Sequence, residues 1–242
     1  AGRVAMLTNV REALLGNAPQ SRGELVTAWL QGDGAWEDFA QGIQAGRYSG
    51  FNLVLGDLAR DRWAWLSNRA GADVAEAEPL AEGLVGRALG PGLYGLSNAA
   101  LDTPWPKTLK LKQALASVVS ASAEGLGDEW RQPLLASLLD RRQAGVEQLP
   151  HTGAPRVWEQ ALSSPFVDYG ERRYGTRSSL LLAVDAGQAV LEEWTHDREA
   201  PAPAEGTGET RGRWPLAHSH YRRMCISMCG IPASSKGSPR TA

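Results

Sequence analysis

The chain has 242 residues, a formal net charge of −2 at pH 7, 43% hydrophobic residues and 21% charged residues, as is usual for a globular protein with a sizeable core. Two cysteines exclude a disulfide-built scaffold, and the nearly balanced charge gives no reason to expect a nucleic acid as partner. No apolar run approaches the length of a membrane span, and the first residues do not resemble a signal peptide. We therefore expect no membrane insertion and a cytoplasmic location.

Residues 201–242 differ in composition from the rest of the chain. They hold six of the 25 basic residues and two of the 27 acidic ones, so they carry +4 whereas residues 1–200 carry −6. Both cysteines, Cys225 and Cys229, lie here, and residues 1–200 contain no thiol. Stretches rich in Pro, Ala, Gly and Ser bury too little apolar surface to offset chain entropy. We expect one domain over residues 1–200 and a mostly disordered tail over 201–242.

In chain order, the first predicted element is a strand over residues 3–9, a short apolar run that ends in a turn former. Ser21 and Glu24 fit a capping box at the start of a helix, and a second helix is expected over residues 35–45. Residues 51–57 and 63–66 are predicted to be paired strands around a polar turn.

The next predicted elements are a strand over residues 92–98 and a long helix that begins near Thr103 and reaches about residue 120. A shorter helix is expected over residues 134–139, and residues 178–193 give a strong hairpin signal. Because helices and hairpins mix without strict alternation, the pattern predicts an α+β fold with an antiparallel sheet.

Two patterns could carry metal or nucleotide chemistry. His218, His220, Cys225 and Cys229 have the right atoms for zinc, but the usual ligand spacing is missing, so we favour a chance cluster and predict no metal site. The glycines near Gly86 and Gly92 do not form a phosphate-binding loop, and no serine-nucleophile elbow occurs.

Three polar residues stand out because of their position. Asn9 and Asn98 each end a predicted strand, where an amide can donate to a developing oxyanion. Arg177 precedes the strongest predicted strand, where its guanidinium can hold a carboxylate or orient a nucleophile. On spacing alone, turn capping by the asparagines and a solvated arginine remain the alternatives.

Several segments together resemble one family over roughly residues 3–197, because they occur in the order typical of that family. They are Leu7-Thr8-Asn9, Ser21-Arg22-Gly23-Glu24-Leu25-Val26, Gly50-Phe51-Asn52-Leu53, Gly92-Leu93-Tyr94-Gly95-Leu96-Ser97-Asn98, Asp102-Thr103-Pro104-Trp105-Pro106-Lys107 and Tyr174-Gly175-Thr176-Arg177. The family is the NRDE family, also called the transport and Golgi organisation 2 family.

The resemblance implies an N-terminal-nucleophile (Ntn) hydrolase-like fold, an αββα sandwich of antiparallel sheets. Relatives in that superfamily cleave linear amides with an N-terminal cysteine, whose α-amino group serves as base. By resemblance, residues at the positions of Asn9 and Asn98 bind the oxyanion, and a residue at the position of Arg177 orients the thiol.

The chain departs from the family pattern at its start. The Met-Cys beginning, the Asn-Arg-Asp-Glu motif and the Gly-Gly-Thr-Trp-Leu-Gly stretch of the family are not found. We therefore expect an N-terminally truncated domain that lacks the first strands. Its catalytic site is then vestigial, with Asn9, Asn98 and Arg177 retained and the nucleophile missing.

Three hypotheses for the function follow. The first is a trafficking or ligand-handling protein, with haem suggested for the family; His151, His196, Met6 and several tyrosines are the available ligand types, so haem contact is expected to be weak. The second is an Ntn-type cysteine amide hydrolase, inactive in this chain because its nucleophile is missing. The third is a partial reading frame without function of its own. We expect no tightly bound cofactor and an unidentified small-molecule ligand. The excess of arginine over lysine suggests a GC-rich bacterial source.

Overall fold

The computed structural model describes residues 2–12, 18–69, 76–121, 128–170, 173–185, 188–196 and 219–227. These residues form a mixed α+β fold whose sheets are antiparallel, which confirms the α+β part of the predicted fold class. No helix among them is long and apolar enough to cross a membrane.

The first sheet has five strands in the order β1-β2-β3-β5-β4. Their bounds are Arg3–Asn9 (β1), Phe51–Asp57 (β2), Arg62–Ser67 (β3), Glu78–Ala81 (β4) and Leu84–Leu89 (β5). The pairing of β1 with β2 places Asn9 opposite Phe51, and β2 forms the predicted hairpin with β3. β2 is buried at every position because both faces of this sheet are covered.

Two short helices cover one face of the first sheet. They are α1 (Gly23–Gln31) and α2 (Trp36–Gln41), and the 3-10 turn η1 (Ala45–Arg47) follows them. Trp29 of α1 and Phe51 and Leu53 of β2 are almost completely buried in the core between these layers. The apolar spacing that predicts the first helix therefore corresponds to the face that packs on the sheet.

The second sheet has three strands in the order β10-β9-β8. Their bounds are Ser178–Asp185 (β8), Gln188–His196 (β9) and Ser219–Ser227 (β10). β8 and β9 confirm the predicted hairpin. Leu181 of β8 and Trp194 of β9 pack against α3 (Pro106–Ala121) and α4 (Arg131–Leu138).

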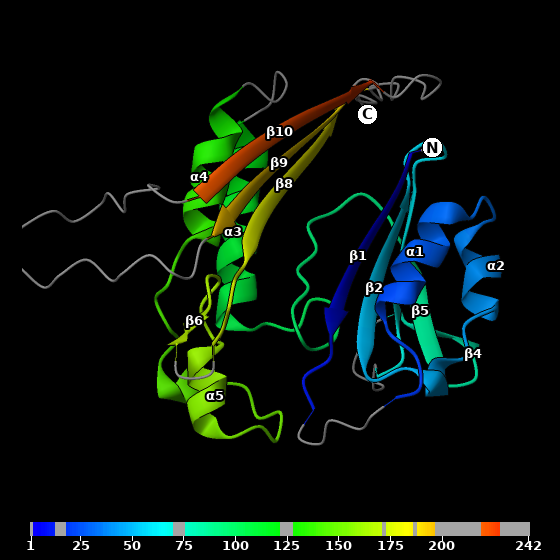
Figure 1. Cartoon of the computed structure of the whole chain (residues 1–242), viewed down its shortest axis with the longest axis horizontal. Coiled ribbons are helices and arrows are strands. Elements are labelled where there is room, and N and C mark those ends of the chain that lie inside the picture. Colours follow the sequence, from blue (N-terminus) through cyan, green and yellow to red (C-terminus); the bar gives the residue numbers. More distant parts are fainter. Residues whose placement is uncertain are drawn as a thin grey trace, which may run out of the picture.

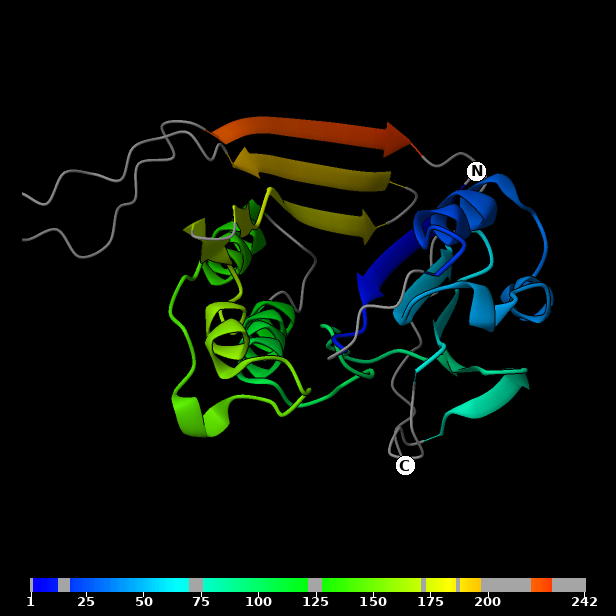
Figure 2. The same cartoon turned by 60° about the horizontal axis from the view of Figure 1, so that its bottom comes forward.

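Each sheet therefore has its helices on one side. In Figure 1 the order across the molecule is α3 and α4, the second sheet, the first sheet, then α1 and α2. Figure 2 shows β8, β9 and β10 side by side along one edge of the molecule. The remaining elements are the 3-10 turns η2 (Asp128–Trp130) and η3 (Val146–Gln148), the helix α5 (Arg156–Ala161), and the strand pair β6 (Asp168–Tyr169) and β7 (Tyr174–Gly175).

The predicted strand over residues 92–98 is wrong, because this segment is irregular. Its residues Tyr94 and Leu96 pack with Val54 and Trp65 on the face of the first sheet that α1 and α2 leave open. Asp102 closes the segment into a loop, since its carboxylate accepts from Gly95 N at 2.7 Å and its own N–H donates to Gly95 O at 2.8 Å. An apolar segment that lies across a sheet face has the same sequence pattern as a strand, although it does not pair with other strands.

The tail contains one described strand, β10, which pairs antiparallel with β9 over its full length. The expectation of a mostly disordered tail therefore does not extend to residues 219–227. Residues 201–218 and 228–242, including His218 and Cys229, lie outside the described residues. The boundary placed at residue 200 stays a prediction.

Candidate functional site

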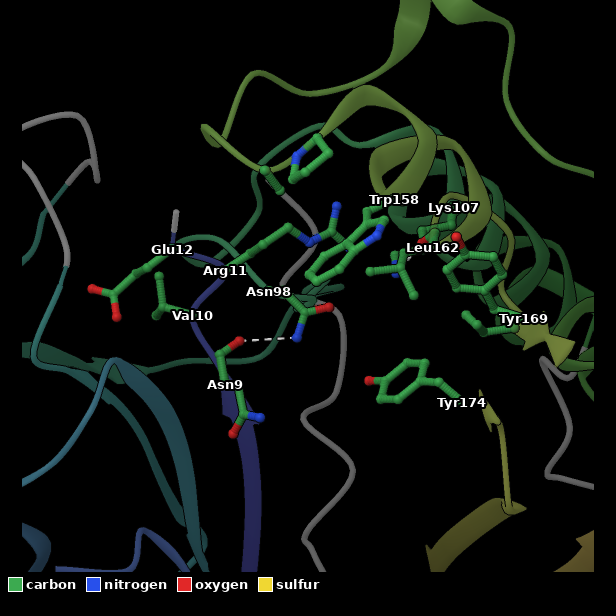
Figure 3. A pocket seen from close by; sticks show the side chains of 13 residues that line it. Asn9, Val10, Arg11, Glu12, Asn98, Lys107, Trp158, Leu162, Tyr169 and Tyr174 are labelled. Carbon is green, nitrogen blue, oxygen red and sulfur yellow. Dashed lines mark hydrogen bonds between the residues drawn. The ribbon is translucent and has the colours of Figure 1, made fainter. Parts of the chain in front are cut away.

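A cavity of about 510 Å³ lies beside the C-terminal end of β1. One side is formed by Asn9 and the residues that follow it, and the other by α5 and the β6–β7 pair (Figure 3). The lining residues are Asn9, Val10, Arg11, Glu12, Asn98, Lys107, Ala154, Pro155, Trp158, Leu162, Val167, Tyr169 and Tyr174.

Asn9 and Asn98 meet at this cavity although 89 positions separate them. The Asn98 side-chain Nδ2 donates to Asn9 O at 2.9 Å, and the backbone N–H of Arg11 donates to Asn98 O at 2.7 Å. Because an amide nitrogen carries two hydrogens, Asn98 retains one that it can donate to a bound group. The two predicted asparagines therefore lie together on one wall of the pocket.

The loop that carries Asn98 is fastened to the ends of β1 and β2. Thr8 Oγ1 donates to Ser97 O at 2.6 Å, and Asn52 Nδ2 donates to Ala99 O at 2.7 Å. Asn52 is fully buried in β2, and its Oδ1 accepts from Trp65 Nε1 at 3.2 Å. A buried amide satisfied on both sides fixes its partners in position, so Asn98 is presented by a rigid support.

Arg177 lies elsewhere. It is exposed, it precedes β8, and its carbonyl accepts from His196 N at 2.8 Å. Among the described residues, Arg177 does not line this cavity, whereas Tyr174, three positions earlier, does. The structure thus brings together two of the three residues predicted for the site.

A buried ion pair joins the two walls of the pocket. Arg11 Nη1 donates to Glu159 Oε2 of α5, and the two side chains are 10% and 1% exposed. The other carboxylate oxygen of Glu159 accepts from Thr152 Oγ1 and from Thr152 N at 3.2 Å. A buried carboxylate with this many donors is satisfied, so Glu159 holds Arg11 rather than serving as a free acid or base.

Lys107 is a half-buried lysine in the first turn of α3. Its Nζ donates to Leu162 O at 3.0 Å and lies 5.8 Å from the centre of the Trp105 ring, which Arg11 also approaches. Burial and the neighbouring Arg11 charge lower the pKa of Lys107 to about 8, although Glu159 acts in the opposite direction. At pH 7 this amine is therefore neutral in about a tenth of the molecules.

Sequence reasoning missed Arg11, Glu159, Lys107 and Trp158. Arg11 and Glu159 are 148 positions apart, and no local pattern links them. Lys107 does belong to the segment Asp102–Lys107 that carries the family resemblance, which is a signal that could have indicated it.

The pocket offers few ligands for a metal. Among the described residues, no group of three or more His, Cys, Asp or Glu side chains could hold an ion. Two described lining residues, Tyr169 and Tyr174, are of a type that ligates haem iron. His151, His196 and Met6 are not among the lining residues; His196 instead hydrogen-bonds Ser179 Oγ at 3.0 Å.

Comparison with known proteins shows the family to which the chain belongs. Residues 1–196 match the family model described as Transport and Golgi organisation 2. The Transport and Golgi organization protein 2 homologs of Bos taurus and Homo sapiens are 32% and 33% identical over 192 and 195 residues, each alignment covering 76% of this chain. The chain spans 65% of the length of these two relatives. This chain belongs to the Transport and Golgi organisation 2 family.

Proposed function

We propose that this protein binds an amphipathic small molecule in the pocket beside β1, as a ligand-handling member of its family. The observation that carries the proposal is the pocket itself, whose volume of about 510 Å³ lies in the range of small-molecule sites. Trp158, Leu162 and Val167 give it an apolar wall, while Asn98 and Lys107 add polar groups. Such a lining favours a ligand with an apolar body and one polar end.

The names of the relatives refer to transport and Golgi organisation. They support a trafficking role for this chain in which the bound molecule is carried or handed on. Haem is the specific ligand that the family resemblance suggests. Tyr169 and Tyr174 are the pocket residues that would hold its iron, and when bound it would supply redox or oxygen chemistry.

The test is a haem titration followed by the Soret band, paired with titration of the amphipathic dye 8-anilinonaphthalene-1-sulfonate. Ala154→Trp is designed to fill the cavity, because Ala154 lines it from a loop. Ala59→Trp is the matched control in the exposed turn between β2 and β3.

We expect both probes to bind at one molecule per chain, with affinity at least about tenfold weaker in Ala154→Trp and unchanged in Ala59→Trp. An unchanged Soret band with saturable dye binding would exclude haem and keep the pocket as a ligand site. Failure of both probes, or equal binding to the filled variant, would overturn the proposed function.

The second candidate is a vestigial Ntn-type amide hydrolase. Asn98 supports it, because its Nδ2 keeps one hydrogen for a bound group, as does the helix, sheet, sheet, helix order, which fits the proposed αββα sandwich. The position of Arg177 outside the described pocket lining and the absence of a thiol from residues 1–200 oppose turnover by this chain. Ligand handling is therefore the function that the site supports best.

A further inference from the structure

Lys107 differs from the other described lysines in its surroundings. Lys112 pairs with Asp102 at 2.6 Å, and Lys110 pairs with Asp140. Among the described residues, Lys107 forms no ion pair, and its Nζ donates to the carbonyl oxygen of Leu162 instead. Of these three amines, Lys107 alone lines the pocket beside β1. A lysine buried at a ligand site without a carboxylate partner is a candidate nucleophile.

We propose that Lys107 is a covalent attachment point for a ligand that bears an aldehyde or ketone, which it holds as an imine. This inference rests on the proposed function, since it requires that the pocket bind a small molecule. It adds the chemical class of that molecule: a carbonyl group at one end of an apolar body.

The charges around Lys107 favour its neutral form. Arg11, after β1, lowers its pKa and Glu159, on α5, raises it, while burial has the largest effect. Glu12, Tyr169 and Tyr174 are the other titratable groups that line the same pocket. With a pKa of about 8 rather than 10.5, the neutral fraction at pH 7 is larger by roughly 300-fold. Desolvation beside a second cation is an established way to activate a lysine amine.

The hydrogen bond to Leu162 is compatible with attack. A neutral amine keeps two hydrogens, so it can retain the 3.0 Å bond to Leu162 O through one of them and still present its lone pair. Lys107 and Leu162 both line the cavity. Leu162 and Trp158 supply the apolar surface for the body of the ligand (Figure 3).

The chemistry balances without an oxidant or reductant. The Nζ lone pair forms a bond to the carbonyl carbon as the C=O π bond breaks, and one proton passes from the nitrogen to the oxygen to give a carbinolamine. The hydroxyl then leaves as water while nitrogen loses its remaining hydrogen as a proton, which leaves a C=N bond between ligand and Lys107. The products are one imine and one water, and hydrolysis reverses the step.

The experiment uses the full chain with 2-naphthaldehyde as probe and sodium cyanoborohydride to reduce any imine to a stable secondary amine. Peptide mass spectrometry then locates the adduct among the four lysines and the chain's α-amino group. Binding of 2-naphthalenemethanol, which lacks the carbonyl, is measured in parallel by calorimetry. Lys107→Arg removes the nucleophile and keeps the charge, and Lys112→Arg is the matched control on the same helix.

We expect the Lys107 adduct at pH 7 to exceed those at Lys110 and Lys112 by at least tenfold. Lys107→Arg should abolish it, and Lys112→Arg should leave it unchanged. Equal labelling of all lysines, or binding of both naphthalene probes without an adduct at Lys107, would overturn the imine proposal and leave the proposed function standing. Absence of both binding and adduct would overturn both. If a variant fails to fold, the imine proposal is still tested by the adduct yields at Lys107, Lys110 and Lys112 within the wild-type chain.

Discussion

At the residue scale, the ion pair between Arg11 and Glu159 joins segments that are distant in the sequence. Both side chains are nearly inaccessible, and Thr152 completes the bonding of the carboxylate. An intact buried ion pair contributes little to stability. Removal of one partner costs much more, because the remaining charge is then uncompensated in a poorly hydrated site.

We predict that Glu159→Gln lowers the free energy of unfolding by about 3 kcal/mol, since it leaves the Arg11 guanidinium buried without its counter-charge. Urea denaturation at pH 7 measures the change. The same substitution should shift the titration of Lys107 to lower pH, because Glu159 raises the pKa of that lysine.

The exposed pair between Arg141 and Asp168 supplies the control for this prediction. Its side chains are 46% and 60% exposed, so Asp168→Asn should cost less than about 1 kcal/mol. Equal losses in the two variants would show that burial does not determine the strength of the Arg11–Glu159 interaction.

At the element scale, β5 approaches β3 more closely than a side chain would allow. Gly86 is opposite Leu66 in the antiparallel register. A Cβ at Gly86 would overlap the carbonyl oxygen of Trp65 and lie 2.7 Å from Leu66 Cδ2. Glycine inside a strand often marks such a close backbone approach, and a backbone oxygen in a central ladder cannot move aside.

Gly86→Ala should therefore destabilise the first sheet by about 2–3 kcal/mol, as overpacking usually does. The midpoint of urea unfolding is the measurement. Gly90→Ala, just beyond β5, is the comparison, because a Cβ there has no neighbour within 4 Å. This variant should be as stable as the wild type or slightly more stable. A Gly86→Ala protein as stable as the wild type would contradict the close contact with Trp65.

The elements that sequence reasoning predicted are those with their own local pattern. β2, β3 and the β8–β9 hairpin have apolar runs around turns, and α3 begins at Pro106, a residue that is favoured in the first turn of a helix. The short α5 and the β6–β7 pair have no such pattern, since six and two residues are too few to show a period. β10 is formed by a basic segment, and this segment becomes a strand because the tertiary structure places it beside β9.

At the scale of the whole molecule, the pocket arises where segments attached to the two sheets meet. Asn9 ends β1 of the first sheet, while Lys107 and Trp158 belong to helices packed on the other side. The asparagines could be predicted because each follows a strand-like run, and Asn98 was found although its run forms no strand. The cavity walls could not be predicted, because they depend on how the two layers are placed.

His196 and Lys107 are two of the groups whose lowered pKa values make the stability of the chain depend on pH. Burial, with a smaller contribution from Arg141, lowers the pKa of His196 below 6.5, and Lys107 titrates near 8 instead of 10.5. For each group, the unfolded chain binds more protons than the folded chain at pH values between the group's pKa in the folded chain and its ordinary pKa. The free energy of unfolding should therefore rise with pH up to about 6.5, and again between about pH 8 and 10.

Urea unfolding at closely spaced pH values tests this profile. His196→Gln should flatten the acidic rise and leave the alkaline one, Lys107→Met should reduce the alkaline rise and leave the acidic one, and the exposed His151→Gln should change neither. The acidic slope belongs to the second sheet, because His196 ends β9 and binds Ser179 of β8. Lys107 contributes the part of the alkaline slope that belongs to the pocket, and Lys110, whose pKa is also lowered, contributes from outside it. A saturating ligand that forms an imine with Lys107 should therefore reduce the alkaline rise and leave the acidic one, because the Lys107 amine is then part of a new bond. An alkaline rise of unchanged size with the ligand attached would mean that Lys107 does not contribute to it.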